Sequence, residues 1–368
     1  MIHVAGMSRT LSLYIARRFL GGFGLVLLAL GAIIFLIDIL EFLRRGSGKP
    51  EITFPLIIEL AILKLPHTME RIVPFAALFG GMFAFWKLTR SSELIVARAS
   101  GVSVWQFLLP AIAVSVLVGM FAIAAFNPFS ATLLLRYERL ESEYFKGQDE
   151  LLSISESGLW LRQGGTQQES VIHALRMAPA DMVLKEVTVF LYDSEHRFAG
   201  RLDADEATLE DGTWRITNVL VTGPDRPSRK EADYRLPTDW TPEKIQDSFA
   251  PPETLSFWRL PSFIGLLEQA GFAATRHRVH WYSLFATPIM LAAMVLIAAS
   301  FSLRMARRGG AALLLTAGVL FSFFVFFLSD VVVALGLSAT IPPALAAWTP
   351  ATTTTLIGLT ILLHIEDG

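Results

Sequence analysis

Charged residues are distributed very unevenly along this chain, and no other feature constrains its fold as strongly. Of its 64 Asp, Glu, Lys and Arg residues, 41 lie between Phe129 and Arg278, which leaves 23 for the other 218 residues. Only 17% of the chain is charged, whereas about a quarter of a typical soluble domain is charged. The sequence therefore predicts a membrane part, then a water-exposed domain, then a second membrane part.

Six uncharged runs can cross a bilayer, whose apolar core of about 30 Å requires a helix of about 20 residues. The second run is long enough only if the more polar stretch Pro55–Arg71 continues the same helix. A turn at Ile341-Pro342-Pro343 separates the last two runs. The expected spans lie near Phe19–Ile37, Ile72–Trp86, Ala99–Leu135, Val279–Leu303, Gly309–Ser329 and, after the turn, the run that ends at Ile365.

Lys and Arg residues in the short loops indicate the orientation, because they are enriched on the cytoplasmic side of membrane proteins. If the N-terminus is cytoplasmic, nine of them lie in the cytoplasm, and only Arg44, Arg45 and Lys49 lie in the opposite short loops. We therefore expect cytoplasmic N- and C-termini and a middle domain outside, which in a bacterium is the periplasm. The nine are Arg9, Arg17, Arg18, Lys87, Arg90, Arg98, Arg304, Arg307 and Arg308.

Short alternating runs after residue 150 predict a β domain. The segments SGLWLRQ, ESVIHALRM, EVTVFLYD and TWRITNVLV place apolar side chains at every second position. Asp211-Gly212 suits a hairpin turn, and several short strands favour a sandwich or jelly roll over a parallel sheet. Such a domain can have a filled core or an open groove that accepts lipid chains, and both alternatives stay open at this point.

Sequence motifs for covalent chemistry are absent. None of the histidines lies in HExxH, no Gly-x-Ser-x-Gly occurs, and no cluster has metal-ligand spacing. The Gly-Lys pair in RRGSGKP lacks the first glycine of a phosphate-binding loop and is followed by Pro50 instead of Ser or Thr. The net charge of −2 argues against a nucleic-acid partner. We expect a protein that is not an enzyme and has no cofactor of its own.

A segment between the second and third spans, FWKLTRSSELIVARASGVSVWQF, is a candidate for contact with another protein. Ser91 or Ser92 can cap a helix there, and Glu93 lies in the first turn, where the helix dipole favours an acid. Leu94 gives the helix an apolar side. Such a helix on the cytoplasmic surface could transmit force from a soluble motor, with Glu93 pairing to an Arg of that motor. The alternative is a plain capped connector.

A second candidate group, which we call the basic ring, lies near the expected outer ends of the first three spans. Its members on the second span recur at three- or four-residue spacing and therefore share one helix face. Together they could hold phosphate groups of an anionic lipid. The alternative is snorkelling at the membrane surface with local pairs, such as Arg136 with Glu138 or Glu141. The basic ring comprises Arg44, Arg45, Lys64, His67, Arg71, Arg136 and Arg139.

The chain resembles the LptF/LptG family in two respects. One is the order of three spans, an outer β domain and three spans, and the other is a set of four sequence segments. That family comprises the paired permease subunits of the ABC transporter that extracts lipopolysaccharide from the bacterial inner membrane. The resemblance covers nearly the whole chain and is nearer to the G-type member, chiefly through LIDILEFLRR and SGLW. The four segments are RSSELIVARASGVS, SESGLWLR, TRHRVHWYSLFATPIM and IPPALAAWTP.

The resemblance implies a fold and a location in the inner membrane. The chain would be a multi-pass α-helical membrane protein with six transmembrane helices and a periplasmic β-jellyroll domain between the third and fourth. Residues 1–140 would contain three helices and a cytoplasmic coupling helix near residues 91–101. Residues 141–258 would form the jellyroll, and residues 259–368 a linker helix and the last three spans.

The resemblance also implies roles for single residues. Glu93 matches the acid of the coupling helix that contacts the ATPase subunit, with Ser92, Leu94 and Arg98 beside it. His67 lies where some relatives have a lysine that faces the lipid cavity.

Three arginines match basic residues of the family. Arg136 and Arg139 match an arginine pair that meets lipid A phosphates, and Arg276 matches an arginine of the linker before the fourth span. Where relatives can have lysines within and just after the first span, this chain has Phe35, Glu41 and Phe42.

The implied complex contains an LptF-like homologue, two copies of an LptB-like ATPase that binds ATP and Mg²⁺, and an LptC-like subunit. ATP-driven closure of a lateral cavity would expel lipopolysaccharide upward into the jellyroll. The alternatives are the F-type partner of the same complex, and a mechanotransmission or scaffold protein that carries no lipid. A membrane hydrolase would require a polar catalytic set within the spans, which the sequence lacks.

Overall fold

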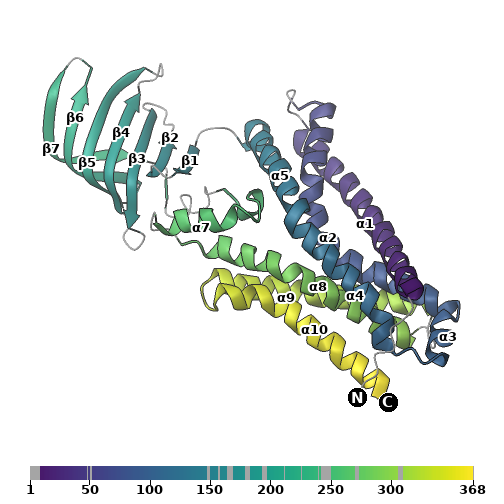
Figure 1. Cartoon of the computed structure of the whole chain (residues 1–368). Coiled ribbons are helices and arrows are strands. Elements are labelled where there is room, and N and C mark those ends of the chain that lie inside the picture. Colours follow the sequence, from purple (N-terminus) through teal and green to yellow (C-terminus); the bar gives the residue numbers. More distant parts are fainter. Residues whose placement is uncertain are drawn as a thin grey trace. The chain divides into compact units, whose positions relative to one another are not determined.

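The computed structural model divides into two compact units, which are described separately (Figure 1). The helical unit comprises Met1–Leu140, Glu253–Trp258 and Arg278–Gly368, and the sheet unit comprises Glu141–Pro252 and Arg259–His277. The structure describes residues 9–47, 49, 52–146, 150–155, 158–163, 169–178, 183–192, 197–210, 212–224, 226–238, 240–241, 250–269, 273–305 and 310–367.

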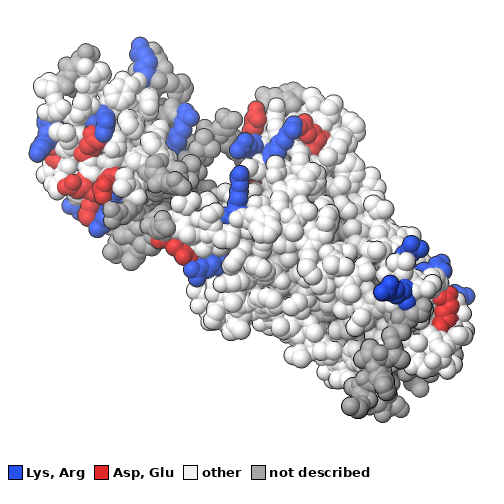
Figure 2. Space-filling view, in the orientation of Figure 1, with Lys and Arg blue, Asp and Glu red and all other residues white. Residues whose placement is uncertain are grey.

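Six helices in the described part of the chain are long and apolar enough to cross a membrane, which confirms the six predicted spans. α2 is a single helix that begins before Pro55 and runs through Arg71, as the length of the second span required. Pro55 does not interrupt it, because this proline lies in the first turn, where a missing N–H is tolerated. On the face that Figure 2 shows, charged side chains gather at the two ends of the helical unit, and its middle is free of them. The helices are α1 (Arg9–Gly46), α2 (Phe54–Arg90), α4 (Val104–Phe121) continued by η1 (Ala122–Phe126), α5 (Asn127–Glu141) and η2 (Ser142–Lys146), α8 (Thr275–Met305), α9 (Gly310–Leu337) and α10 (Pro343–Asp367).

α1 and α2 approach closely where two glycines face each other. A Cβ at Gly80 would lie 2.5 Å from the Cα of Phe23, and a Cβ at Gly22 would lie 2.5 Å from the carbonyl oxygen of Gly80. Small residues allow helix backbones to approach in membranes, where packing replaces the hydrophobic effect as the main attraction between helices. The pair therefore sets the spacing of the first two spans.

We predict that Gly80→Ala lowers the stability of the protein in detergent. The new methyl group has no room beside the backbone of α1, and overpacking of this kind costs about 1–3 kcal/mol. The control is Gly21→Ala, because nothing lies within 4 Å of a Cβ at that position of α1. The measurement is the midpoint of thermal unfolding, and equal midpoints for the two variants would contradict the close approach.

The sheet unit contains one antiparallel sheet whose strands follow chain order from β1 to β7. The β domain predicted between the third and fourth spans is therefore present, and its described strands form a meander without a Greek-key crossover. Short connections produce this order, because each strand pairs with the next along the chain. Gly212 has a φ of 75° at the predicted hairpin turn, and Asp211 lies outside the described residues. The strands are β1 (Glu150–Ser155), β2 (Gly158–Gln163), β3 (Glu169–Ala178), β4 (Val183–Tyr192), β5 (Phe198–Glu210), β6 (Thr213–Gly223) and β7 (Arg226–Pro237).

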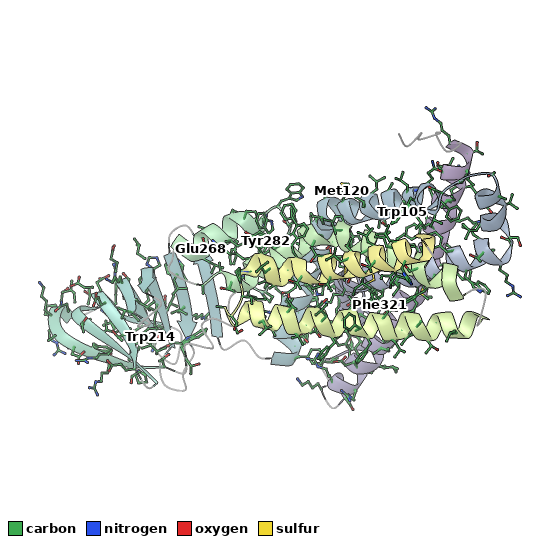
Figure 3. All side chains as sticks on the ribbon, turned by 90° about the horizontal axis from the view of Figure 1, so that it is seen from below. Trp105, Met120, Trp214, Glu268, Tyr282 and Phe321 are labelled. Atoms are coloured by element: carbon green, nitrogen blue, oxygen red, sulfur yellow. The ribbon has the colours of Figure 1, made fainter. Side chains whose placement is uncertain are left out.

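One face of the sheet carries the apolar core of this unit. Trp214 of β6, labelled in Figure 3, is fully buried, as are Leu161 and Leu202. Helix α7 (Leu260–Gln269) belongs to the same unit, contacts β1 and buries Leu260 completely. Apolar side chains thus fill the core in the described part of the domain.

Candidate functional site

The Lys64 ammonium, a member of the basic ring, is bound to a carboxylate of α1. Lys64 Nζ lies 2.7 Å from Asp38 Oδ1, and the Asp38 side chain is only 7% exposed. The ammonium also lies 5.4 Å from the centre of the Phe42 ring, within the range of a cation–π contact. The positive charge of Lys64 is therefore compensated inside the pair of helices.

Phe42 is one of the three residues at which the resemblance implied lysines, and the structure shows how its ring is packed. Its side chain is 1% exposed and packs against Tyr137 of α5, with ring centres 6.0 Å apart. A lysine at this position would place a second ammonium beside Lys64 in a buried environment. The aromatic ring instead joins α1, α2 and α5.

Arg136 pairs with Glu59 of α2, a partner that the local pairs considered from the sequence did not include. Arg136 Nη2 lies 2.5 Å from Glu59 Oε1, and the two side chains are 65% and 42% exposed. The partners are 77 positions apart in sequence, so only the packing of α5 against α2 brings them together. This pair is far more exposed than the pair of Lys64 and Asp38.

His67 lies in a polar cluster inside the helical unit. Its Nδ1 is 3.9 Å from Glu70 Oε2, with side-chain exposures of 14% and 17%. Arg71 and Glu253 are close enough to act electrostatically on His67. Glu70 in turn interacts with Asn127 of α5. Polar groups at this depth face protein or water rather than lipid, as predicted from the helical spacing.

Asn127 anchors a short segment that the sequence analysis did not single out. Asn127 is 1% exposed, and its Oδ1 accepts a hydrogen bond of 2.8 Å from the backbone N–H of Phe257. The indole N–H of Trp258 donates to the carbonyl oxygen of Ala124, 3.2 Å away. Ala124 lies in the π-helical turn η1, and π-helical turns are often found at functional sites. The segment is thereby fixed to the helical unit.

The remaining basic residues of the prediction are accessible. Arg44, Arg71 and Arg139 are exposed and form no ion pair with another described residue, while Arg45 is half-buried and does interact. Arg276 is exposed in the first turn of α8 and belongs to the sheet unit. Among the predicted cations, Lys64 is thus paired with a buried carboxylate, whereas Arg136 is paired but exposed. Arg44, Arg71 and Arg139 are exposed without such a pair among the described residues.

The predicted coupling helix is α3 (Glu93–Ala99). Ser92 precedes it with a φ of 60°, and the Ser91 hydroxyl donates to Glu93 Oε1 at 2.9 Å, so Ser91 orients the acid. Leu94 is 5% exposed and packs into the core of the helical unit. Arg98 lies on α3, but its side chain is outside the described residues. Glu93 is thus held on a short helix that Leu94 anchors to the spans.

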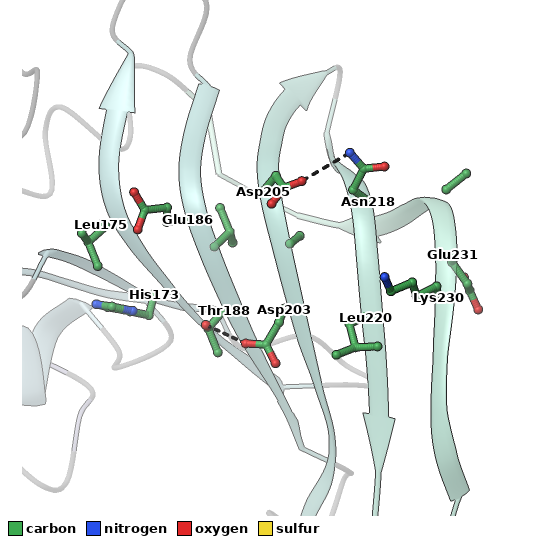
Figure 4. Close-up of a pocket in the computed structure, with 13 residues that line it drawn as sticks. His173, Leu175, Glu186, Thr188, Asp203, Asp205, Asn218, Leu220, Lys230 and Glu231 are labelled. Atoms are coloured by element: carbon green, nitrogen blue, oxygen red, sulfur yellow. Dashed lines mark hydrogen bonds between the residues drawn. The ribbon is translucent and has the colours of Figure 1, made fainter.

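A hollow of about 790 Å³ lies on the polar face of the sheet (Figure 4). Glu186 and Asn218 have φ angles of 54° and 56° there, a left-handed conformation that is uncommon for residues other than glycine. The Thr188 hydroxyl donates to Asp203, and the Asn218 amide donates to Asp205. The lining contains four carboxylates and a single lysine, so the hollow suits neither acyl chains nor phosphate groups.

Sequence comparison identifies the family of the chain. A profile of the family described as "Lipopolysaccharide export system permease LptF/LptG" matches residues 13–364. The chain belongs to this family. The "Lipopolysaccharide export system permease protein LptG" of Escherichia coli (strain K12) is 25% identical over 347 residues, which cover 92% of this chain and 93% of the relative. The Haemophilus influenzae protein of the same name is 22% identical over 338 residues, with coverages of 88% and 90%.

Membership of the LptF/LptG family agrees with the two units of the structure. The match extends from α1 to α10 and therefore includes both the spans and the sheet. The six apolar helices and the family together describe a multi-pass inner-membrane permease. Within it, the described cations of α1, α2 and α5 and the acid of α3 are the candidate functional groups.

We predict that Lys64→Met destabilises the protein by about 3 kcal/mol, because it leaves the buried Asp38 carboxylate without its partner. Asp38→Asn combined with Lys64→Met should recover most of this loss, since no buried charge then remains. The measurement is denaturant-induced unfolding in detergent micelles. The control is Glu59→Gln, which breaks an exposed pair and should cost less than about 1 kcal/mol. Equal effects of Lys64→Met and Glu59→Gln would show that the Asp38 pair is not buried.

Proposed function

We propose that this chain is the G-type permease subunit of an ABC transporter that extracts lipopolysaccharide from the outer leaflet of the inner membrane. The observation that carries the proposal is the family match over residues 13–364, and the LptG name of the curated relatives favours the G type. The chain passes the lipid to a periplasmic bridge, while a separate subunit hydrolyses ATP. It binds and releases its cargo and performs no covalent chemistry.

The proposed complex has the composition that the family suggests. An LptF-like homologue encloses the lateral cavity with this chain, two LptB-like subunits bind ATP and Mg²⁺, and an LptC-like subunit receives the lipid. The N- and C-termini and α3 lie in the cytoplasm, and the sheet unit lies in the periplasm. The nine Lys and Arg residues of the cytoplasmic loops support this orientation.

The proposed mechanism rests on differential binding between an open and a closed state. In the open state, acyl chains lie against apolar helix faces, and Arg136, Arg139 and Arg71 hold phosphate groups. Guanidinium groups suit this role because they form paired charge-assisted hydrogen bonds with phosphate. ATP-driven closure of the ATPase pair presses on α3, and the spans move together. We leave Lys64 out of the phosphate contacts, because Asp38 already binds its ammonium.

Glu93→Ala should uncouple ATP hydrolysis from lipid release, because it removes the acid that pairs with an arginine of the ATPase. Loss of about 1.4 kcal/mol at this contact lowers the rate about tenfold. The measurement is ATP-dependent release of lipopolysaccharide from the whole complex in nanodiscs. Ser100→Ala is the control, since the Ser100 hydroxyl donates to the carbonyl oxygen of Ala97 at the other end of α3 and not to Glu93. Undiminished release by Glu93→Ala with the ATPase docked would contradict the coupling role.

Arg136→Gln combined with Arg139→Gln should weaken lipid A binding by the complex about 10- to 100-fold. Each lost hydrogen bond between charged groups contributes about 1.5–3 kcal/mol, part of which water recovers at these exposed sites. Arg17→Gln combined with Arg18→Gln removes the same charge near the N-terminal end of α1 and should leave the affinity unchanged. The measurement is equilibrium binding in nanodiscs. Equal affinities of the two double variants would remove the assigned role of the arginine pair.

A further inference from the structure

The two ion pairs of the basic ring differ in the exposure of their partners. Asp38 is 7% exposed where it binds Lys64, whereas Glu59 is 42% exposed and Arg136 is 65% exposed. A phosphate group in the surrounding medium can reach the second pair without any movement of the helices. The Lys64 ammonium is less accessible to it, because the Lys64 side chain is 28% exposed and its partner Asp38 is 7% exposed.

We propose that Glu59 is an exchangeable counter-ion of Arg136, which the phosphate group of a lipid headgroup displaces. The inference rests on the proposed function and adds a residue that sets the affinity and the headgroup selectivity of the basic ring. An exposed carboxylate–guanidinium pair contributes little free energy in water. A phosphate presents more oxygens and more negative charge than a carboxylate, and it forms paired hydrogen bonds with a guanidinium.

Buried side chains beside the pair do not depend on it. Leu60, next to Glu59, is fully buried, and Tyr137, next to Arg136, is 5% exposed. Tyr137 also contacts Phe42 of α1. The contact of Tyr137 with Phe42 therefore still holds α5 to α1 when the carboxylate of Glu59 is released. This separates a counter-ion, which can exchange, from a brace, which must remain in place.

Competition determines the size of the expected effect. The bound carboxylate lowers the affinity of Arg136 for phosphate by the stability of the ion pair, a factor of about two to five for an exposed pair. Glu59→Gln should therefore raise the affinity for bisphosphorylated lipid A about two- to fivefold. The gain should vanish when Arg136 is absent, because Glu59 acts only through that guanidinium.

The experiment measures binding of bisphosphorylated and fully dephosphorylated lipid A to the whole complex in nanodiscs. The variants are Glu59→Gln, Arg136→Gln and the combination of the two. Glu41→Gln is the control, since Glu41 is a half-buried acid of α1 without an ion pair to another described residue. We expect tighter binding of the bisphosphorylated lipid by Glu59→Gln alone, no change with the dephosphorylated lipid, and equal affinities for the double variant and Arg136→Gln.

Several outcomes would overturn the inference. An equal gain from Glu41→Gln, or a gain from Glu59→Gln that persists without Arg136, would indicate general electrostatics. Weaker binding by Glu59→Gln would indicate a brace. Displacement of lipid by inorganic phosphate at equal concentration would assign Arg136 to free phosphate. If Arg136→Gln weakens binding and Glu59→Gln changes nothing, the counter-ion role fails while the proposed function stands. If Arg136→Gln itself has no effect, the phosphate-binding role of Arg136 fails as well.

Discussion

The low capacity of a bilayer for unpaired charge is the constraint on which the rest of the helical unit depends. A charged side chain in the apolar core of a membrane is expensive, so it must be paired, placed near water or left out. All three solutions occur here. Asp38 is buried and paired with Lys64, the exposed Arg44, Arg136 and Arg139 lie near helix ends, and the middle of the unit shows no charged side chains on the face in Figure 2. This constraint therefore limits where the helical unit can carry charged side chains.

The same constraint applies to backbone groups, and it explains the segment around Phe257. A π-helical turn shifts the pattern of helix hydrogen bonds, and the carbonyl of Ala124 in that turn accepts the indole N–H of Trp258. Asn127 accepts the N–H of Phe257 in a buried site. The Phe257 ring packs 4.8 Å from that of Phe285 on α8. The segment is flanked on both sides by residues of the sheet unit, so the chain leaves the helical unit from a firmly held point.

The spans and the β domain could be predicted because their signals are local. Hydropathy over about 20 residues marks a span, and alternation over four to eight residues marks a strand. The strand order was harder to predict, because pairing depends on contacts along the whole domain. The left-handed φ angle of Glu186 has no local sequence signal, because glutamate rarely adopts it. The sequence predicted that Ser91 or Ser92 caps α3, whereas Ser91 ends α2 and its hydroxyl donates to carbonyl oxygens of α2 and to Glu93.

The candidate site shows the same division between local and distant information. Helical spacing placed Lys64, His67 and Arg71 on one face of α2, because three or four positions separate them. It did not reveal that Asp38 neutralises Lys64, 26 positions away, or that Glu59 pairs with Arg136. The two pairs have the same chemistry, and only burial separates their consequences. In the buried pair, loss of one partner leaves a charge that water cannot reach, so the pair holds α1 to α2. In the exposed pair, water can reach both partners and a phosphate can replace the carboxylate of Glu59, so the pair can open without leaving a buried charge. Burial therefore decides which cations of a basic cluster are available to an anionic lipid.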